Sequence, residues 1–373
     1  MTLPPEAIAR FATDLRALAP TPTTATPLAL AVSGGPDSMA MLALAAAAFP
    51  NAVIAATVDH RLRAASAQEA AMVAGWCHAN HIPHATLSPD HPPAGASIQA
   101  QARHLRYALL ADWALAANAV ALATAHHADD QAETFLMRAA RGSGPAGLAG
   151  IRPRWEFDAD RWATQAPNLI RIPAKAGAQL GDGTASPTTL SNWPPASAGV
   201  RYEGSVGSLP IVRPLLNWRR ADLRTLAAGL PFIDDPSNTD PRHDRTHARA
   251  LLATGQLDPL ALAAAAAHCR EVDAALDDIV DQLWRTRRTA DDAATHIDVT
   301  DCPRELRRRL ARRAIAETRA THHVTEGRWF DATNIESLLD ALESGKSATQ
   351  AGILVTPKRQ IWRFSPAPAR RSV

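Results

Sequence analysis

The sequence predicts an α/β fold, in which a doubly wound parallel sheet is followed by a smaller, mainly helical C-terminal domain. Two observations predict the sheet: short apolar runs alternate with helical patterns over the first 150 residues, and polar clusters follow three of those runs. Parallel strands joined by helices produce this alternation, and such sheets bind ligands beyond the carboxyl ends of their strands. The second domain is predicted from the Ala/Leu-rich helical pattern after residue 250, a basic helix at residues 304–314 and a hairpin-like segment at residues 353–355 and 361–364.

The expected elements alternate regularly along the first part of the chain. Strands are expected over residues 28–32, 52–58, 84–87 and 119–125. Helices are expected over residues 39–48, 66–79, 97–116 and 129–140. Because a helix separates each strand from the next, the strands are expected to run parallel, with helices on both faces of the sheet.

The junction at residues 33–38, Ser-Gly-Gly-Pro-Asp-Ser, is the most informative stretch of the chain. A strand that ends at two glycines and continues as a helix aims backbone N–H groups and a positive helix end at one point. This arrangement suits phosphate oxygens. The Walker pattern is excluded because it needs a lysine in the loop, and the first lysine of the chain is Lys175. A simple tight turn is the structural alternative.

Polar clusters also follow the later strands, at what should be the same edge of the sheet. They are Asp59-His60-Arg61, and His126-His127 with Asp129-Asp130. From this edge the side chains of His60 and His126 could reach an adenine or a phosphate. A histidine with a purely structural role is the alternative at both positions.

Three acids lie at the start of the helix expected over residues 129–140. Helical spacing of three and four residues puts Glu133 on the same face as Asp129 and Asp130. Acids that converge repel one another unless a cation joins them, and magnesium or an ammonium group would serve. The alternative is a helix N-terminus that the acids merely stabilise.

These residues carry a resemblance to a known family. The loop at residues 33–38 resembles the pyrophosphate-binding loop of the PP-loop ATP-pyrophosphatases, which split ATP between the α and β phosphates. Four further segments resemble tRNA(Ile)-lysidine synthetase, and the match spans roughly residues 28–250. The segments are residues 58–69, 102–107, 124–148 and the pair 213–216 with 235–240. The run His126-His127-x-Asp129-Asp130-Gln131-Ala132-Glu133-Thr134 is the most specific of them.

The resemblance implies a fold like that of the adenine-nucleotide alpha hydrolases and an AMP-forming ligase activity. ATP would adenylate the oxygen on carbon 2 of the wobble cytidine in an isoleucine tRNA with a CAU anticodon. The lysine side-chain amine would then displace AMP to form lysidine. A carbonyl oxygen is a poor leaving group, and adenylation makes it a good one.

The resemblance also implies roles for named residues. ATP would be bound by Ser33, Gly34, Gly35, Pro36, Asp37, Ser38, Asp59, His60 and His126. The substrate lysine would be bound by Asp129, Asp130 and Glu133. Catalysis would depend on Asp37, Arg106, Asp130, Glu133 and Arg245. Asp37 is also the expected magnesium ligand, since a carboxylate so close to phosphate needs a cation between them. An acid favoured by the helix dipole is the alternative for Asp37, and a solvated surface arginine is the alternative for Arg106.

Residues 1–250 are expected to form the catalytic domain, with a flexible insertion at residues 155–209, and residues 251–373 a helical tRNA-binding region. Residues 1–150 carry 8 arginines and 10 acids, whereas residues 301–373 carry 14 basic residues and 8 acids. Basic charge away from the catalytic half suits a polyanionic partner. The residues expected to contact tRNA are Arg249, Arg304, Arg308 and Arg312. A solvated helix face with Glu305 and Glu317 as partners is the alternative.

Two other functions fit parts of the sequence. A PP-loop enzyme that thiolates tRNA commonly needs paired cysteines, but Cys77, Cys269 and Cys302 are scattered. A non-catalytic ATP-binding module would not need the acid cluster. The N-terminus shows no targeting signal and no apolar run is long enough for a membrane span, so we expect a cytoplasmic protein. The oligomeric state stays open, a homodimer included.

Overall fold

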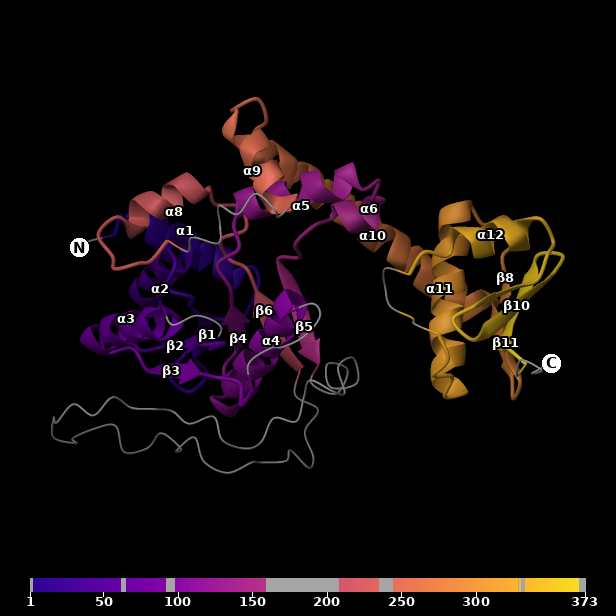
Figure 1. The fold of residues 1–373 in the computed structure, drawn as a ribbon, viewed down its shortest axis with the longest axis horizontal. Helices are drawn as coiled ribbons and strands as arrows, with labels where there is room; N and C mark the ends of the chain where they lie inside the picture. The colour runs from indigo at the N-terminus through magenta and orange to yellow at the C-terminus, as the bar shows by residue number, and fades with distance from the viewer. Residues whose placement is uncertain are drawn as a thin grey trace. The chain divides into compact units, whose positions relative to one another are not determined.

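The expected sheet is present in the computed structural model, which describes residues 3–61, 65–91, 98–158, 208–234, 244–327, 329 and 333–368. The sheet has the strand order β3-β2-β1-β4-β6-β5 (Figure 1). Its strands are β1 (Leu28–Ala31), β2 (Val53–Val58), β3 (His84–Leu87), β4 (Ala121–Ala123), β5 (Arg154–Asp158) and β6 (Ser208–Val212). All neighbouring strands are parallel except β5, which runs antiparallel to β6. The four strands expected from the sequence are β1 to β4.

The edge strand β5 was not expected, because the sequence analysis assigned residues 155–209 to a flexible insertion. Both ends of that stretch are strands, with Arg154 opposite Val212 and Asp158 opposite Ser208. Trp155 packs against Tyr107 with ring centroids 5.5 Å apart. The missed signal was the alternation of residues 154–158, in which Phe157 is buried between two exposed acids. Residues 159–207 lie outside the described part.

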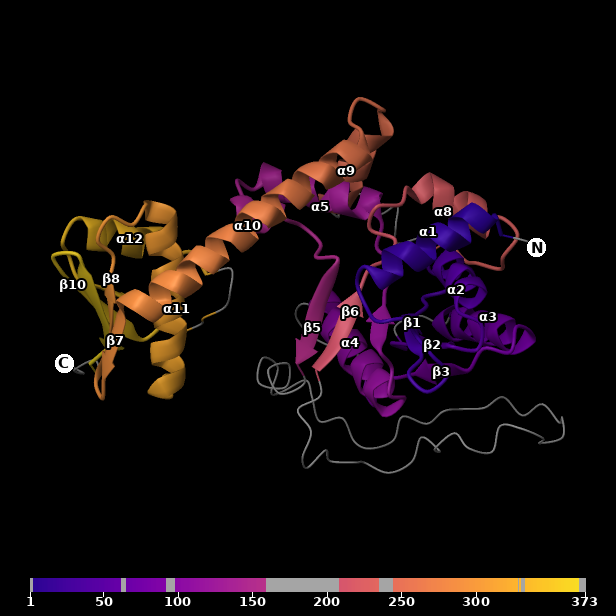
Figure 2. The same cartoon turned by 180° about the vertical axis from the view of Figure 1, so that it is seen from behind.

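Helices cover both faces of the sheet (Figures 1 and 2). One face packs against α1, α2, α3 and α8, and the other against α4. The helices of this part of the chain are α1 (Pro5–Arg16), α2 (Pro36–Ala48), α3 (Ala65–Ala79), α4 (Ile98–Ala116), α5 (Ala128–Ala140), α6 (Pro145–Leu148), α8 (Arg220–Ala227) and α9 (Asp244–Ala253). The pattern is therefore doubly wound, as the sequence predicted.

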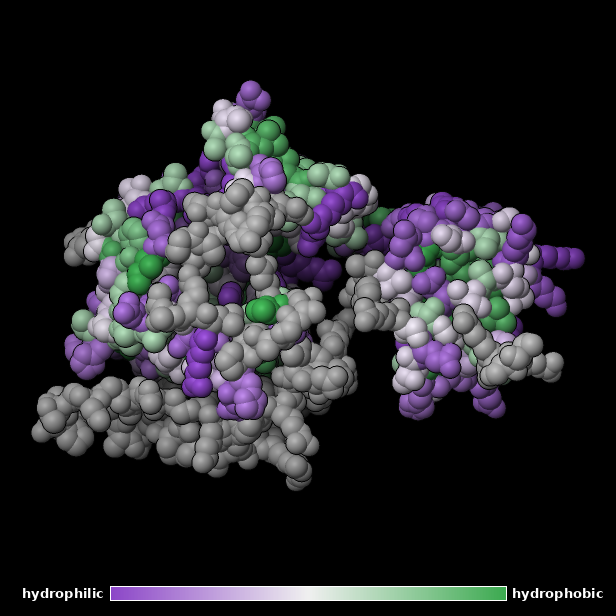
Figure 3. Space-filling model, in the orientation of Figure 1, coloured by the Kyte–Doolittle hydropathy of each residue, from purple (hydrophilic) through white to green (hydrophobic). Residues whose placement is uncertain are grey.

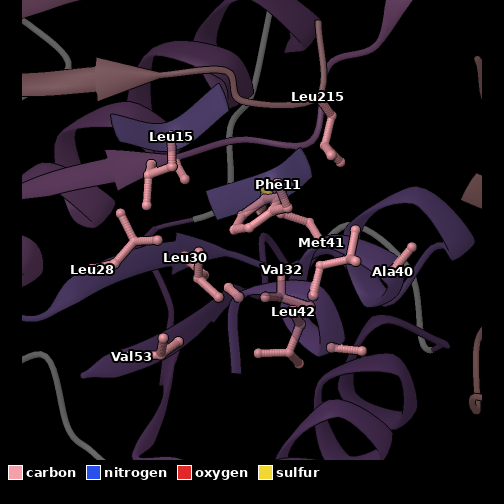
Figure 4. Close-up of a cluster of buried hydrophobic side chains, with 14 of the residues drawn as sticks. Phe11, Leu15, Leu28, Leu30, Val32, Ala40, Met41, Leu42, Val53 and Leu215 are labelled. Atoms are coloured by element: carbon pink, nitrogen blue, oxygen red, sulfur yellow. The ribbon is translucent and has the colours of Figure 1, made fainter. Parts of the chain in front are cut away.

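The core between β1 and α1 follows from the two-residue period of a strand. Leu28 and Leu30 face α1 and α2, whereas Ala29 faces α4. Phe11 and Leu15 of α1, both fully buried, close this core from outside (Figure 4). Truncating a buried phenylalanine such as Phe11 to alanine typically costs about 3–5 kcal/mol. The core thus fixes β1, and with it the loop that follows.

The strand order reverses between β1 and β4. From β1 the chain passes through α2, β2 and α3 to β3 on one side, and it then returns over the opposite face through α4 to β4. In open α/β sheets, ligands bind in the crevice where this reversal occurs, beyond the carboxyl ends of the strands. Residues 33–38 after β1 and His126-His127 after β4 flank that crevice.

The chain divides into two units, Met1–Ala267 and His268–Val373, and the division falls within α10 (Pro259–Arg287). The second unit has a five-stranded antiparallel sheet in the order β7-β8-β11-β10-β9. Its further elements are β7 (Arg288–Asp291), β8 (Ala294–Asp298), α11 (Arg304–Thr321), α12 (Glu336–Glu343), β9 (Ala348–Gln350), β10 (Ile353–Lys358) and β11 (Ile361–Pro366). The expected hairpin is β10 with β11, and the expected basic helix is α11.

Three strands of this second sheet were not anticipated. β7 and β9 are short and polar, with the sequences RTAD and ATQ, and β8 is half polar, so none carries an apolar run that predicts a strand. They are strands because β8 pairs with β11, and β9 with β10. In the described part of the chain, no helix combines the length and apolar character that a membrane span needs.

Candidate active site

The phosphate loop is shaped by its glycines. Gly34 has φ +84°, and a Cβ placed there would lie 3.3 Å from Cε of Met72. Its carbonyl accepts a hydrogen bond from Ile233 N at 3.0 Å, which ties the loop to the segment after α8. Gly35 is the N-cap of α2 and has no side chain with which to cap it. Pro36 has no N–H and Met39 N donates to the Gly35 carbonyl, so the donors left for a ligand are the N–H groups of Gly35, Asp37 and Ser38.

The two serines of the loop have different roles. Ser38 is buried, and its hydroxyl donates to the carbonyl of Gly35 at 2.9 Å while it accepts from Ser33 N at 3.2 Å. Ser33 is exposed. The two hydroxyls lie 3.3 Å apart, and both residues are among those expected to bind ATP. The structure uses Ser38 to hold the loop closed and leaves Ser33 at the surface.

Asp37 connects the loop to the helix that follows β4. One carboxylate oxygen, Oδ2, lies 3.4 Å from Nε2 of His127. The other, Oδ1, is buried, and no donor within the described residues reaches it. A buried carboxylate oxygen without a donor is a candidate ligand for a cation.

His127 begins α5 and joins three acids. Its Nδ1 accepts from Asp130 N at 3.3 Å, and its own N–H donates to Oδ2 of Asp130 at 3.2 Å, so the two form a capping box. Burial alone would lower the pKa of His127. The hydrogen bond to Asp37 and the charges of Asp130, Asp37 and Asp129 outweigh burial and raise this pKa. The sequence analysis named His127 only as part of a motif and gave it no role, because histidine is not a usual N-cap residue.

Asp130 stays charged although it is largely enclosed. Burial would raise the pKa of its carboxyl group, but His127 and Arg245 lower it further than burial raises it. The Nη2 atom of Arg245 lies 3.9 Å from Oδ1 of Asp130. Asp130, which the resemblance assigns to lysine binding, is therefore an anion at the edge of the crevice.

Glu133 is the most deeply buried of the three acids, with a side chain 2% exposed. Arg245 Nε lies 3.0 Å from its Oε2, and Arg249 Nε donates to its Oε1 at 2.6 Å. Both arginines belong to α9. A buried charge needs such partners, because leaving it unpaired is costly. Arg249, which we had expected at a tRNA surface, thus lies beside the acids.

Asp129 lies near His127, with its Oδ2 3.8 Å from Nδ1, but its hydrogen bonds go to α8. Its Oδ2 accepts from the backbone N–H of Arg220 at 2.8 Å, at the start of α8, and from Arg219 Nε at 3.3 Å. Arg219 also reaches Oδ1 at 3.4 Å. The three acids therefore do not converge as their spacing had suggested. Asp129 anchors α8, and Asp130 and Glu133 face α9.

The two candidate histidines are both neutral. Burial and the charge of Arg106 lower the pKa of His60, and the charge of Asp59 raises it in part. The resulting pKa of His60 is about 4. Arg106 Nε lies 3.4 Å from His60 Nε2. Burial likewise lowers the pKa of His126, whose Nδ1 lies 3.0 Å from Thr124 Oγ1.

Asp59 is engaged within its own segment. Its Oδ1 accepts from Arg61 N at 2.8 Å and from Ser66 Oγ at 2.6 Å. These bonds tie Oδ1 of Asp59 to Arg61 and to the first turn of α3, and the ATP contact expected of Asp59 stays a prediction. Of the quoted family segments, residues 62–64 and 235–240 lie outside the described part.

A cavity of about 540 Å³ opens beside the acids, at the edge where β4 and β6 end. Its lining is rich in arginine and consists of Arg103, His126, Thr134, Arg138, Ala146, Gly150, Ile151, Arg152, Trp155, Arg213 and Arg245. None of the three cysteines lines it, and Cys77 is buried in the core, where burial raises its pKa to about 12. The lining of this cavity therefore contains no cysteine thiolate.

The basic surface expected on α11 is largely compensated by acids of the same unit. Arg304 pairs with Glu336, Asp340 and Glu343 of α12, and Arg308 pairs with Glu336 and with Glu305. Arg312 donates to the Thr333 carbonyl and lies over the ring of Trp329 at 5.4 Å. In Figure 3 the edge of this unit where α12 lies is hydrophilic (purple). The pairing resembles the solvated-face alternative more than a free cationic patch.

Known proteins resemble this chain along most of its length. A family model described as a PP-loop domain matches residues 8–172. A protein named tRNA(Ile)-lysidine synthase from Novosphingobium aromaticivorans is 38% identical over 98% of this chain and 95% of its own. One of the same name from Zymomonas mobilis is 36% identical over 92% and 89%. Among solved structures, a U34-tRNA thiolase from Methanococcus maripaludis has a TM-score of 0.45 at 14% identity, covering 71% of this chain and 78% of that one.

Proposed function

The chain belongs to the tRNA(Ile)-lysidine synthase family, and from this premise we propose how its own residues carry out the reaction. Its relatives and its PP-loop domain assign it the formation of lysidine in tRNA(Ile) with ATP. The observation that best supports a residue-level proposal is the chain of contacts Asp37–His127–Asp130. It joins the phosphate loop to the acids across the strand-order reversal.

In the first step, the carbon-2 oxygen of the wobble cytidine attacks the α-phosphorus of ATP. A new oxygen–phosphorus bond forms, the bond to the bridging oxygen breaks, and pyrophosphate leaves. The N–H groups of Gly35 and the first turn of α2 hold the β and γ phosphates. Arg106 supplies positive charge where negative charge develops on the reacting phosphate. Its neighbour His60 is neutral, so it does not compete with Arg106 for that negative charge.

Magnesium fits the residues at the loop. Asp37 has one oxygen held by His127 and one buried oxygen without a donor in the part of the chain that is described. Magnesium commonly takes one or two carboxylates and completes its shell with phosphate oxygens and water. Asp37 would hold the ion, which would neutralise phosphate charge when bound.

In the second step, the side-chain nitrogen of lysine attacks carbon 2, the bond to the adenylated oxygen breaks, and AMP leaves. The lysine amine must first give up a proton. Asp130 is an anion at the crevice edge and would bind an ammonium group of the substrate. Glu133 would be shared between the substrate and its two arginine partners. Asp129 is already engaged at α8.

The test is a reaction of the purified chain with ATP, labelled lysine and an isoleucine tRNA transcript carrying a CAU anticodon. We expect label to enter the tRNA with equal release of AMP and pyrophosphate. A methionine tRNA with the same anticodon is the substrate control. Incorporation of labelled sulfur would favour a thiolating enzyme, and ATP binding without AMP release would favour a non-catalytic module.

Arg106 tests the residue assignment. Arg106→Ala should lower the rate of adenylation by about 100-fold or more, the cost of removing one preorganised donor. Its side chain is exposed, so the melting temperature should change little. Arg106→Lys keeps the charge and should recover part of the rate. Near-normal adenylation by Arg106→Ala would remove this residue from the site.

A further inference from the structure

The peptide group between Gly34 and Gly35 lies at the centre of the phosphate loop and is joined on both sides to glycine. Glycine has no Cβ, so its backbone has more allowed conformations than that of any other residue. Gly34 already lies in the left-handed region, with φ +84°. The two residues therefore restrain the direction of this peptide weakly, and hydrogen bonds have to fix it.

The direction of this peptide decides what the loop presents to a phosphate. In a planar trans peptide the C=O and the N–H point in opposite directions. The N–H of Gly35 is one of the three donors that the loop leaves for a ligand. If the peptide turned over, the carbonyl oxygen of Gly34 would replace that donor, and its partial negative charge would repel a phosphate.

A residue from outside the loop holds the Gly34 carbonyl. Ile233 N donates to this oxygen at 3.0 Å, although the two residues lie far apart in the chain. The next carbonyl, that of Gly35, accepts instead from the Ser38 hydroxyl at 2.9 Å and from Met39 N at 3.0 Å. Of these two carbonyls, the one of Gly35 is oriented by the loop and α2, whereas the one of Gly34 is oriented by a distant segment.

The segment at residues 230–234, which carries Ile233, is itself held in place. Phe232 packs against the core that contains α1 and α2. Asp234 forms an ion pair with Arg224 of α8, and α8 packs on α2 within the same core. The N–H of Ile233 therefore has a fixed position relative to α2, the helix that the phosphate loop begins.

We propose that Ile233 is a positioning residue for ATP, because its main-chain N–H turns the Gly34–Gly35 peptide so that the Gly35 N–H faces the β and γ phosphates. Ile233 acts through this peptide and does not touch the nucleotide. The proposal rests on the proposed function, since it takes residues 33–38 as the site of the ATP phosphates. It gives a role in the first step to residues 230–234, which lie outside the family segments quoted from the sequence.

The experiment removes the N–H of Ile233 and keeps its side chain. Ile233 is exchanged for the α-hydroxy acid with the same side chain, so that the amide becomes an ester, which cannot donate. The matched control is the same exchange at Leu230, whose N–H donates to the Ala227 carbonyl at 2.8 Å at the end of α8. Each exchange costs the fold one main-chain hydrogen bond, but only the bond from Ile233 reaches the phosphate loop. Ile233→Pro removes the same N–H by ordinary mutagenesis, and Ile233→Val keeps it.

Binding of ATP with magnesium, the melting temperature and the steady-state constants are measured for each form of the full chain. We expect loss of the Ile233 N–H to weaken ATP binding about tenfold, the effect of misdirecting one hydrogen bond to a charged group, and to slow adenylation. The KM for lysine should stay the same, because lysine is expected at α5. The ester at Leu230 should lower the melting temperature by a similar amount, but it and Ile233→Val should bind ATP as the unchanged chain does.

Unchanged ATP affinity after loss of the Ile233 N–H overturns the proposal. An equal loss of ATP affinity with the ester at Leu230 also overturns it, since the effect would then be a general loss of stability.

The two proposals can fail separately. If the unchanged chain forms no lysidine but only the ester at Ile233 weakens ATP binding, the proposed function is wrong and the positioning role of Ile233 stands. If the unchanged chain forms lysidine and the ester at Ile233 binds ATP normally, the positioning role is wrong and the proposed function stands.

Discussion

The Nε atom of Arg249 in α9 lies 2.6 Å from Oε1 of Glu133 in α5, and this contact joins two helices that are more than a hundred residues apart in the chain. Arg245 Nε lies 3.0 Å from the other carboxylate oxygen, Oε2, but makes no hydrogen bond to it. The acid proposed to bind the substrate lysine is therefore also the acid that holds α9 in place. On this proposal, substrate binding and the position of α9 would be coupled through one carboxylate.

Substituting Arg249 tests this contact directly. Arg249→Gln leaves Glu133 with a single charged partner, so we expect a loss of about 2 kcal/mol in the local stability of α5 and α9. Hydrogen exchange of the amides in the two helices measures it, and Arg249→Lys is the control that keeps the charge. If the double variant with Glu133→Gln shows no coupling between the two sites, the contact does not form in solution.

The two neighbouring aspartates should behave differently. Asp130→Asn removes the charge at the crevice edge while it keeps an oxygen that can accept from His127 N, so the KM for lysine should rise at least tenfold with the fold intact. Asp129→Asn weakens the anchor of α8 and should lower thermal stability more than it changes that KM. Steady-state kinetics and melting curves of both variants give the comparison. Equal effects on lysine would restore Asp129 to the lysine site.

Gly34 should not accept a side chain. At φ +84° an alanine is strained by about 1–2 kcal/mol, and its Cβ would also press on Met72. Gly34→Ala should therefore lower the melting temperature and weaken ATP binding. Gly35 has φ −77° and its Cβ would meet only Ser33 Oγ, at 3.7 Å. Gly35→Ala is the stability control and should melt close to the unchanged chain.

His127 should make stability depend on pH. Its pKa is raised in the folded chain, so its protonation beside the aspartates stabilises the fold, although protonation costs the hydrogen bond that Nδ1 accepts from Asp130 N. This contribution is complete below the ordinary histidine pKa of about 6.5 and is lost as the pH rises through the higher folded value. The difference in melting temperature between the unchanged chain and His127→Gln should shrink over that rise. A difference that stays constant with pH would show that His127 is held neutral.

The ion pairs between α11 and α12 in the second unit can be tested through their dependence on pH. Arg308 and Arg304 lower the pKa of Glu336 to about 2. The stability from this lowered carboxyl is present above the ordinary glutamate pKa of about 4.3 and is lost as the pH falls toward 2. The group is exposed, so the effect should be small.

Arg308→Gln should reduce this acid dependence and destabilise the unit more than it weakens tRNA binding. A several-fold loss of tRNA affinity would instead support the contact expected from the sequence.

Local sequence patterns predicted much of the fold of this protein and the edge of the sheet where a ligand would bind. The apolar runs of β1 to β4 and the helices between them were readable because period and composition report burial directly. The glycines at 34 and 35 and the polar residues after the strands identified the ligand edge, since parallel strands end on a common side. The family segments then indicated the chemistry, because motif residues keep their spacing.

Tertiary structure alone decided which charges meet. Helical spacing placed Asp129 with Glu133, but α8 arrives beside Asp129 and α9 beside Glu133, and no local pattern in the chain encodes those approaches. The same is true of α11, whose arginines read as a free basic face until α12 places its acids against them. Residues 154–158 carry a local alternation, but their place as an edge strand depends on pairing with 208–212. Ion pairs and edge strands depend on partners distant in sequence, whereas strands, helices and turns depend mainly on their neighbours in the chain.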